Sequence, residues 1–373
     1  MFYPKREGVL KKCLYDFLNY RLELSNGMPI FASTYQHIYS KTIEKMKNII
    51  QTTAIAALAC MTACTSPEMG KVQTLEKEND FKQTIDLVCE QVEVPAIISI
   101  REWQIQDSLL LCQSDDTDYF YYRFRLSDFA LVDSFITKGQ GPDEFIFPTM
   151  ARSENDEWLA LNRGKREFVK MKGKEMIKEI PYKRYENITD MKTYRYPLVG
   201  YMNFFPREVT WKLFDVETNT VKDSILYMDE TNKGQALQQH DFKWDFGADN
   251  RVVLAFRNRD EYTVAKLQAD TIANIKIYHG TESTASGAYY TDVQCSDKYI
   301  FLLSGKHDAS TMESDEHSSE IEVFDYEGNA VCLLKLDYAA SNMLLDKKHS
   351  RFLFTSYSDD DIHFAPIPDF LKD

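Results

Sequence analysis

Short apolar runs alternate with polar turns along the body of this chain, a pattern that predicts β-strands. From about residue 82 onward there is little helical periodicity, and β-branched and aromatic residues recur. A nearly continuous apolar run returns at intervals of 40–54 residues. The six runs are Ser108–Cys112, Trp158–Leu161, Leu198–Tyr201, Val252–Phe256, Tyr299–Leu303 and Phe352–Thr355. We interpret each run as an inner strand that neighbouring units bury on both faces.

Each of the first five runs is followed by a strand–turn–strand hairpin. The turns fall at Ser127-Asp128, Lys172-Gly173, Glu217–Asn219, Gln268–Asp270 and Glu327–Asn329. A four-stranded unit of this length is the period of a β-propeller blade. The pattern therefore predicts an all-β, six-bladed β-propeller over residues 81–373. The alternative is a pair of β-sandwich domains.

The C-terminal part of the chain has too few strands to complete the last blade. Only Ile362–Ala365 and a short tail follow the sixth run, whereas residues 82–100 contain two unassigned strand-like stretches, Lys82–Cys89 and Val94–Ile100. Closing the ring removes exposed sheet edges. We therefore expect these N-terminal strands to complete the last blade.

The segment from Gly139 to Phe147 follows the first hairpin and is typical of a tight crossing between blades. Gly139 and Gly141 permit positive φ, and Pro142 fixes φ. We expect the carboxylates of Asp143 and Glu144 to accept hydrogen bonds from backbone N–H groups of the loop. We expect the rings of Phe145 and Phe147 to anchor the loop in the core. A phosphate cradle is disfavoured because no Gly-Lys-Ser/Thr follows.

Residues 139–145, with the pattern G-x-G-P-x-E-F, resemble a turn of the TolB-like six-bladed propeller lipoproteins of bacterial envelopes. The resemblance extends over roughly residues 75–370. It implies a propeller held at the cell envelope, and it implies no particular activity.

Residues 46–63 have the order of an export signal. Met46-Lys47-Asn48 gives a basic start, an apolar stretch of signal-peptide length follows, and Met61-Thr62-Ala63 precedes Cys64. The stretch is too short to span about 30 Å of hydrocarbon. It resembles a bacterial lipoprotein signal, which implies cleavage before Cys64 and attachment of lipid there. The alternative is a buried core helix or a poor membrane segment.

This interpretation divides the N-terminal part of the chain. We expect residues 1–45 to be an over-called extension upstream of the true start, although they could be a long translated n-region. Residues 64–80 are polar and charged, which favours a flexible tether. The protein is then exported and lipid-anchored in the cell envelope, in our expectation on the outer membrane.

Charge and cysteine usage narrow the function classes. The net charge is −14, and an acidic body repels phosphate backbones, so nucleic-acid binding is disfavoured. No cysteines form a CxxC pair or zinc-finger spacing. Cys89, Cys112, Cys295 and Cys332 remain after Cys64; two disulfides are possible, but Cys112 and Cys332 have the setting of buried apolar residues.

One loop combines aromatic and acidic residues, as ligand sites often do. Trp244 could stack on a sugar or peptide at the end of the channel, with Asp245, Asp249 and neighbouring His240 orienting it. The alternative places Trp244 in the core and the aspartates in turns.

Two clusters that could hold a metal, His307 with His317 and Asp359–Asp361 with His363, are instead expected to be a solvated loop and a strand-end turn. No cofactor is expected, and no G-x-S-x-G or H-E-x-x-H motif is present. We therefore predict a binding or scaffolding module for a protein, peptide or glycan. The alternative is an envelope hydrolase or lyase acting in the central channel, with His240, Asp245 and another carboxylate.

Overall fold

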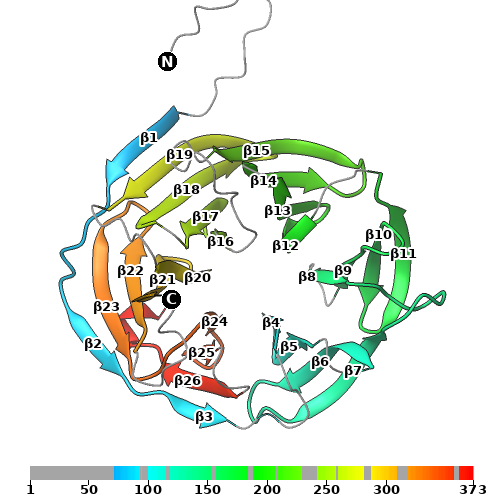
Figure 1. Ribbon diagram of the computed structural model, residues 1–373, viewed down its shortest axis with the longest axis horizontal. Helices are drawn as coiled ribbons and strands as arrows, with labels where there is room; N and C mark the ends of the chain where they lie inside the picture. Colours follow the sequence, from blue (N-terminus) through cyan, green and yellow to red (C-terminus); the bar gives the residue numbers. More distant parts are fainter. Residues whose placement is uncertain are drawn as a thin grey trace, which may run out of the picture. The chain divides into compact units, whose positions relative to one another are not determined.

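Six twisted β-sheets stand as blades around a central channel (Figure 1). The computed structural model describes residues 71–92, 94, 100–114, 118–152, 157–183, 188–205, 208–228, 242–257, 259–280, 287–308, 318–356 and 361–372. Within these residues the six-bladed propeller predicted from the sequence is confirmed. The same residues contain no helix long and apolar enough to cross a membrane.

Blades 1 to 3 are antiparallel sheets of four strands each, numbered outward from the channel. Their strands are β4 (Glu102–Gln106), β5 (Leu109–Gln113), β6 (Tyr119–Arg125) and β7 (Leu131–Thr137); β8 (Thr149–Arg152), β9 (Glu157–Asn162), β10 (Glu167–Lys172) and β11 (Glu175–Pro181); and β12 (Ile188–Arg195), β13 (Leu198–Phe205), β14 (Glu208–Asp215) and β15 (Thr220–Met228).

Blades 4 to 6 continue the ring, and a short 3₁₀ turn, η2 (Asp369–Leu371), follows the last strand. Their strands are β16 (Phe242–Gly247), β17 (Arg251–Phe256), β18 (Glu261–Gln268) and β19 (Thr271–His279); β20 (Gly287–Cys295), β21 (Tyr299–Asp308), β22 (Glu320–Asp325) and β23 (Ala330–Leu336); and β24 (Asn342–Asp346), β25 (Arg351–Thr355) and β26 (Ile362–Pro366).

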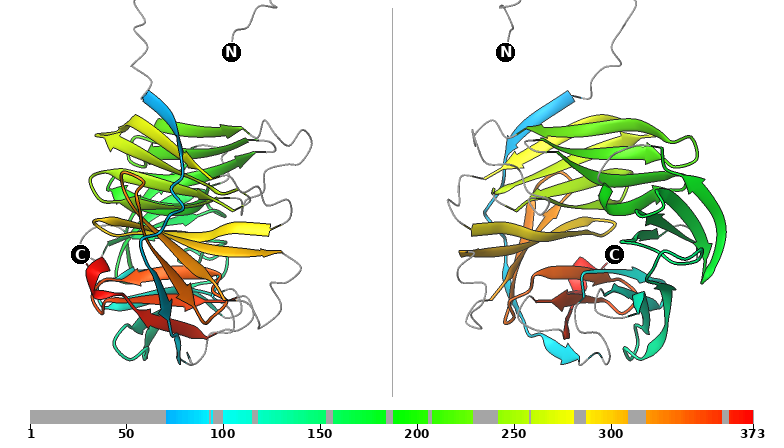
Figure 2. Two further views of the ribbon diagram at one scale, coloured as in Figure 1. Left: turned by 90° about the vertical axis from the view of Figure 1, so that its left-hand side faces the viewer. Right: turned by 45° about the vertical axis from the view of Figure 1, so that its right-hand side comes forward.

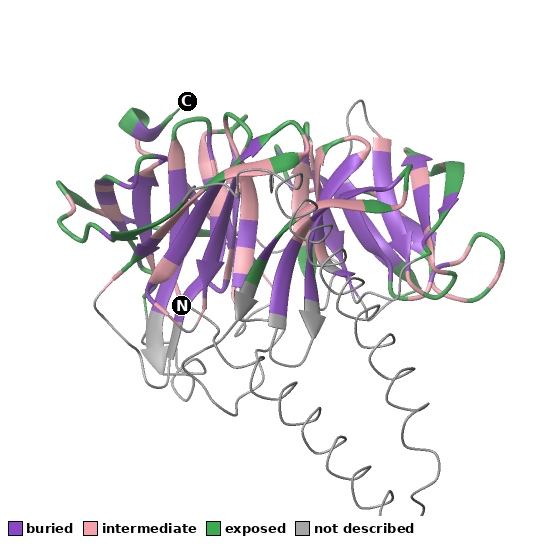
Figure 3. Cartoon of the chain, turned by 90° about the horizontal axis from the view of Figure 1, so that it is seen from above, coloured by how far each residue is buried: buried purple, intermediate pink, exposed green. Residues whose placement is uncertain are grey.

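Each apolar run is the second strand of its blade, not the innermost one. In β17, for example, Val252–Phe256 are fully buried, because this strand has partners on both sides within its sheet and blades against both faces. Figure 3 shows that buried residues lie along the strands of the ring. The innermost strands β4, β8, β12, β16, β20 and β24 border the channel and carry polar side chains at intervals. Hence the strongest hydrophobic signal in the sequence marks the middle of each blade.

The N-terminal segment 71–92, here called the strap, runs along the outer edges of blades 4, 5 and 6 in turn (Figures 1 and 2). β1 (Lys71–Glu76) pairs parallel with β19, and β2 (Thr84–Leu87) pairs parallel with β23. β3 (Glu90–Val92) pairs antiparallel with β26 and completes blade 6.

Ring closure by an N-terminal strand is therefore confirmed, with three differences from the sequence analysis. The closing strand, Glu90–Val92, lies between the two stretches named there. The stretch Lys82–Cys89 adds to blade 5 through β2 rather than to the last blade. The sequence analysis placed residues 71–76 within the flexible tether, but they form strand β1. The outer edge of β19 offers unpaired backbone groups with which this segment pairs. Cys64 and the rest of residues 1–70 lie outside the described residues.

A buried ammonium group fixes the strap to the junction of blades 4 and 5. The Lys77 side chain is 0% exposed and forms ion pairs with Asp260, which precedes β18, and with Glu322 of β22, the latter at 2.9 Å. Lys77 Nζ also donates to the Tyr290 hydroxyl at 2.9 Å. Burial and the two carboxylates hold the pKa of Tyr290 well above its ordinary value, so the hydroxyl stays a donor.

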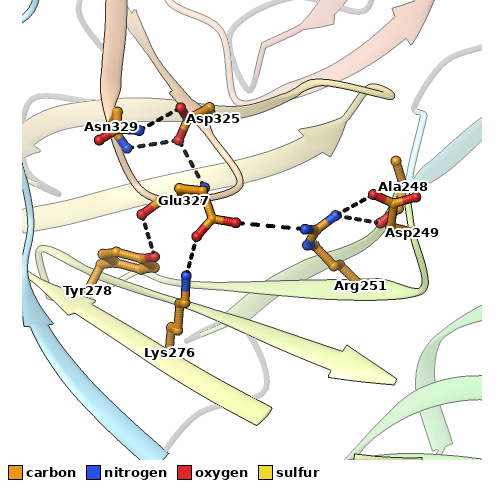
Figure 4. Close-up of polar contacts among 8 residues, drawn as sticks. All are labelled: Ala248, Asp249, Arg251, Lys276, Tyr278, Asp325, Glu327 and Asn329. Atoms are coloured by element: carbon orange, nitrogen blue, oxygen red, sulfur yellow. Dashed lines mark hydrogen bonds and ion pairs between the residues drawn. The ribbon is translucent and has the colours of Figure 1, made fainter. Parts of the chain in front are cut away.

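A second contact between the same blades lies at the β22–β23 turn (Figure 4). Glu327 accepts a hydrogen bond from Lys276 Nζ at 2.6 Å, and its carbonyl accepts one from the Tyr278 hydroxyl at 2.8 Å. Gly328 has a φ of +92°, and a Cβ there would collide with the Tyr278 ring. The predicted turn at Glu327–Asn329 therefore also joins neighbouring blades.

The Gly139–Phe145 segment is a tight crossing between blades 1 and 2. The Gly141 N–H donates to the Glu144 carboxylate at 2.7 Å, and the Gly139 N–H donates to the Phe145 carbonyl at 3.1 Å. A Cβ on Gly139, whose φ is +153°, would collide with Glu144. The Phe145 ring is buried with residues of both blades.

Parts of that turn differ from expectation. Gly141 does not adopt positive φ. Phe147 is 64% exposed and is no core anchor. Pro142 and Asp143 are both exposed, and the Pro142 carbonyl accepts a hydrogen bond from Lys165.

The four cysteines Cys89, Cys112, Cys295 and Cys332 are free thiols, and Cys112 and Cys332 are fully buried, as apolar residues would be.

We expect Lys77→Met to destabilise the propeller by roughly 3–5 kcal/mol, since it leaves two buried carboxylates without their cation. Urea unfolding of the purified chain measures this loss. Lys276→Met, which removes a partly exposed partner of Glu327, is the matched control and should cost less than about 1 kcal/mol. Equal, small losses for both variants would contradict a structural role for the buried cluster.

Candidate functional site

The channel encloses a cavity of about 550 Å³ to which all six blades contribute. Its lining comes mainly from the innermost strands and carries charges of both signs. Acidic side chains there include Glu102, Asp190, Asp245 and Asp292, and basic ones include Lys192 and Lys243. A volume of this size is typical of sites for small ligands or chain ends.

Lys192 and Asp245 neutralise each other across blades 3 and 4. Lys192 Nζ lies 3.2 Å from Asp245 Oδ1 and donates to the Trp244 carbonyl at 2.6 Å. The second oxygen of Asp245 accepts the Cys295 N–H at 3.0 Å. Burial lowers the pKa of Lys192, but the surrounding carboxylates more than offset this and raise it above its ordinary value. Both charges are therefore already engaged within the protein.

Asp292 also has hydrogen-bond partners within the protein, and its role is structural. Its two oxygens accept the Val293 N–H and the Met343 N–H, each at 2.8 Å, so it ties blade 5 to blade 6. Burial raises its pKa, an effect that Lys243 and Lys192 oppose.

Four charged side chains of the cavity have no hydrogen-bond or ion-pair partner among the described residues. Among the residues that the structure describes, the side chains of Glu102, Asp190 and Lys243 form neither a hydrogen bond nor an ion pair with one another or with other groups. They come from blades 1, 3 and 4 respectively. The fourth, Lys348, is exposed in the turn between β24 and β25. The three side chains on the innermost strands, here called the open charges, are available to a ligand in the cavity.

Glu102 titrates near neutral pH. Its side chain is exposed to solvent at the cavity, but the protein atoms around the channel desolvate the carboxyl group, and this desolvation raises its pKa to about 7. The charge of Asp190 raises the pKa further, whereas Arg163, Lys243 and Arg101 lower it. Glu102 can therefore change its charge in the physiological range.

Asp190 is held in an uncommon backbone conformation. Its φ is +46°, and the register of β12 against β13 shifts between Thr189 and Lys192. Aspartate tolerates this region better than most residues. The Asp190 carbonyl accepts a hydrogen bond from Trp244 Nε1 at 3.2 Å, which fixes the bulge toward the cavity.

Trp244 therefore acts on the site from the core. Its ring is 1% exposed and packs against Trp211 at 5.8 Å between ring centroids, and against Phe246 at 5.1 Å. It supports Asp190 and Lys192 through its indole nitrogen and its carbonyl, and it offers no open face on which a ligand could stack.

The other residues singled out in the sequence are separated. Asp245 lines the cavity beside Trp244. Asp249 lies in the β16–β17 turn, 77% exposed in its side chain, and pairs with Arg251 at 3.0 Å (Figure 4). His240, His317, Asp359, Asp360 and the side chain of His307 lie outside the described residues.

Sequence reasoning missed Glu102, Asp190, Lys192 and Lys243. A signal was present, since Asp190 and Lys192, like Lys243 and Asp245, stand two positions apart in short segments just before an apolar run. Alternation of this kind places side chains on one face of a strand. Within the described part of the chain, no group of three His, Cys, Asp or Glu side chains could hold a metal ion.

The family described as TolB-like 6-blade propeller-like matches residues 101–348. The chain belongs to this TolB-like family. The resemblance found in the G-x-G-P-x-E-F turn is thereby confirmed over most of the ring. No curated protein matches the chain.

Two solved structures illustrate the shared fold. One is a proposed exported protein from Bacteroides fragilis, with 10% identity, a TM-score of 0.50, and coverage of 80% of this chain and 100% of that one. The other is regucalcin, a calcium-binding protein from Agrobacterium tumefaciens, with 8% identity, a TM-score of 0.51, and coverage of 76% and 95%. At such identities the likeness concerns the fold alone.

The raised pKa of Glu102 makes stability depend on pH. Folding raises this pKa from the ordinary 4.5 to about 7, so the folded state gains stability from the bound proton at low pH and loses it as the pH rises through this window. Glu102→Gln cannot ionise. Its melting temperature relative to the wild type should therefore increase between about pH 5 and about pH 8, as measured by thermal unfolding.

Glu217→Gln is the matched control for that measurement. Hydrogen bonds from Lys178 and Tyr196 hold the pKa of Glu217 below its usual value, so it stays ionised across the same interval. Its difference from the wild type should not change with pH there. A flat profile for Glu102→Gln as well would contradict the shift.

Proposed function

We propose that this protein is an exported, lipid-anchored binding module of the cell envelope, and that it holds its ligand in the central channel. The observation that carries the binding half is the set of open charges, Glu102, Asp190 and Lys243, in a cavity of about 550 Å³. A ring of six blades keeps such groups at fixed distances, so little entropy is lost on binding. The ligand is a small polar molecule, or the end of a peptide or glycan chain.

The anchoring half rests on residues 46–64. The order of basic start, apolar stretch and Cys64 supports export with lipid attachment. Membership of a propeller family, and likeness to a protein proposed to be exported, agree with this location. Outer-membrane placement, with a peptide, protein or glycan as the partner, is part of the same proposal.

We expect Cys64→Ser to release the protein from the membrane fraction and to abolish its acylation, because the thiol is the attachment point. Cys60→Ser, four positions upstream, is the matched control and should stay membrane-bound. Membrane fractionation and mass spectrometry of the mature N-terminus measure both. Identical behaviour of the two variants would exclude Cys64 as the anchor.

The channel is tested by ligand capture. The full-length lipidated protein is immobilised, exposed to envelope extract, washed and analysed by mass spectrometry for retained small molecules and oligomers. Lys243→Glu reverses an open charge of the cavity, and we expect it to lose the compounds that the wild type retains. Lys266→Glu, on the exposed face of β18, should retain them. The same compounds on both variants, or none on the wild type, would refute a channel site.

A second candidate is an envelope hydrolase or lyase using the same channel. It is favoured by the pKa of Glu102, about 7, beside the second carboxyl group of Asp190. A carboxyl group with a raised pKa serves as the general acid in such enzymes, with a second carboxyl group nearby. Turnover of envelope glycans or peptides that Glu102→Gln loses and Glu217→Gln keeps would support it, and retention of the intact compounds by the wild type would count against it.

A further inference from the structure

The open charges of the channel have opposite signs and come from different blades. Glu102 enters from β4, Asp190 from β12 and Lys243 from β16. Lys243 is electrostatically coupled to both Glu102 and Asp292. The two carboxyl groups and the ammonium group thus face a shared space without neutralising each other by direct contact.

This arrangement differs from the engaged pairs next to it. Lys192 and Asp245 are in contact, and Asp292 is held by two backbone N–H groups. The protein therefore satisfies some channel charges internally and leaves others open. A ligand of complementary charge pairs with the open groups and so gains electrostatic free energy that the protein alone does not realise.

The signs of the open groups select the ligand. A molecule with only a positive group would be attracted by Glu102 and Asp190 but repelled by Lys243. A molecule with only a negative group would be attracted by Lys243 but repelled by Glu102 and Asp190. A molecule that carries an ammonium group at one end and a carboxylate at the other satisfies all three. The cavity of about 550 Å³ accommodates such a molecule at the size of an amino acid or short peptide.

We propose that the channel recognises a zwitterionic ligand, an amino acid or short peptide with free termini, whose ammonium group lies at the Glu102–Asp190 pair and whose carboxylate lies at Lys243. This inference rests on the proposed channel-binding function and specifies its ligand class. Trp244 is a positioning residue in this site, because it holds the Asp190 bulge without lining an open face.

The test pairs changes in the ligand with changes in the protein. A pool of tripeptides is prepared in three forms, with free termini, with an acetylated N-terminus and with an amidated C-terminus. Binding of each pool to the full-length lipidated protein is measured by saturation-transfer NMR, and the strongest binders are quantified by calorimetry. We expect either cap to weaken binding by about tenfold or more.

Variants assign each end of the ligand. In Glu102→Gln/Asp190→Asn, acetylation should no longer weaken binding, whereas amidation should still do so. Lys243→Gln should show the opposite. The control variants Asp249→Asn, at another aspartate of positive φ, and Lys266→Gln should respond to both caps as the wild type does.

Each outcome of this test either supports or overturns the proposed zwitterion site. Cap effects that disappear in the expected variants support the zwitterion site. Cap effects that are absent, or that persist in all variants, overturn it. If no tripeptide binds while Lys243→Glu still loses compounds captured from envelope extract, the channel function stands and the ligand class proposed here is wrong. If neither occurs, both proposals fail.

Discussion

A blade of this protein cannot bury its faces alone, because each sheet is apolar on both sides. The central strand β17 needs blades 3 and 5 against its two faces for Val252–Phe256 to be fully buried. Six such sheets bury all of their apolar faces against one another only when the ring is closed, since an open ring would leave two apolar faces in water. Closure is therefore the constraint on which both the core and the channel depend.

The strap is the means of closure, and it does more than supply one strand. β3 completes blade 6, while β1 and β2 add parallel strands to blades 4 and 5. Between them Lys77 places a fully buried ammonium group among Asp260, Glu322 and Tyr290. Such a cluster adds little net stability compared with apolar packing, but it strongly penalises any arrangement in which one partner is absent. It thereby specifies where the strap lies on the ring.

Closure also brings the innermost strands together. Side chains from sequence positions as far apart as Glu102 and Lys243 enter one cavity, where some charges pair and others stay open. Trp244 shows how core and site are connected. Its ring belongs to the packing between blades 3 and 4, while its indole nitrogen and carbonyl hold Asp190 and Lys192 in place. Tryptophan side chains often stack on ligands, but here Trp244 contributes to the site by holding neighbouring residues in position.

The sequence by itself determined the repeat, the number of blades, the family and the hairpin turns, because these depend on local alternation and on turn residues such as Gly328. It also indicated ring closure by N-terminal strands. It placed the apolar runs at inner positions but not at a particular distance from the axis, since a hydrophobicity pattern reports burial only. Only the tertiary structure decided which polar residues meet in the channel. Asp245 enters the cavity and Asp249, four positions later, does not, because the β16–β17 turn carries the chain away from it. The pairing of Lys192 with Asp245 and the open state of Glu102, Asp190 and Lys243 follow from contacts between blades, which local sequence does not encode.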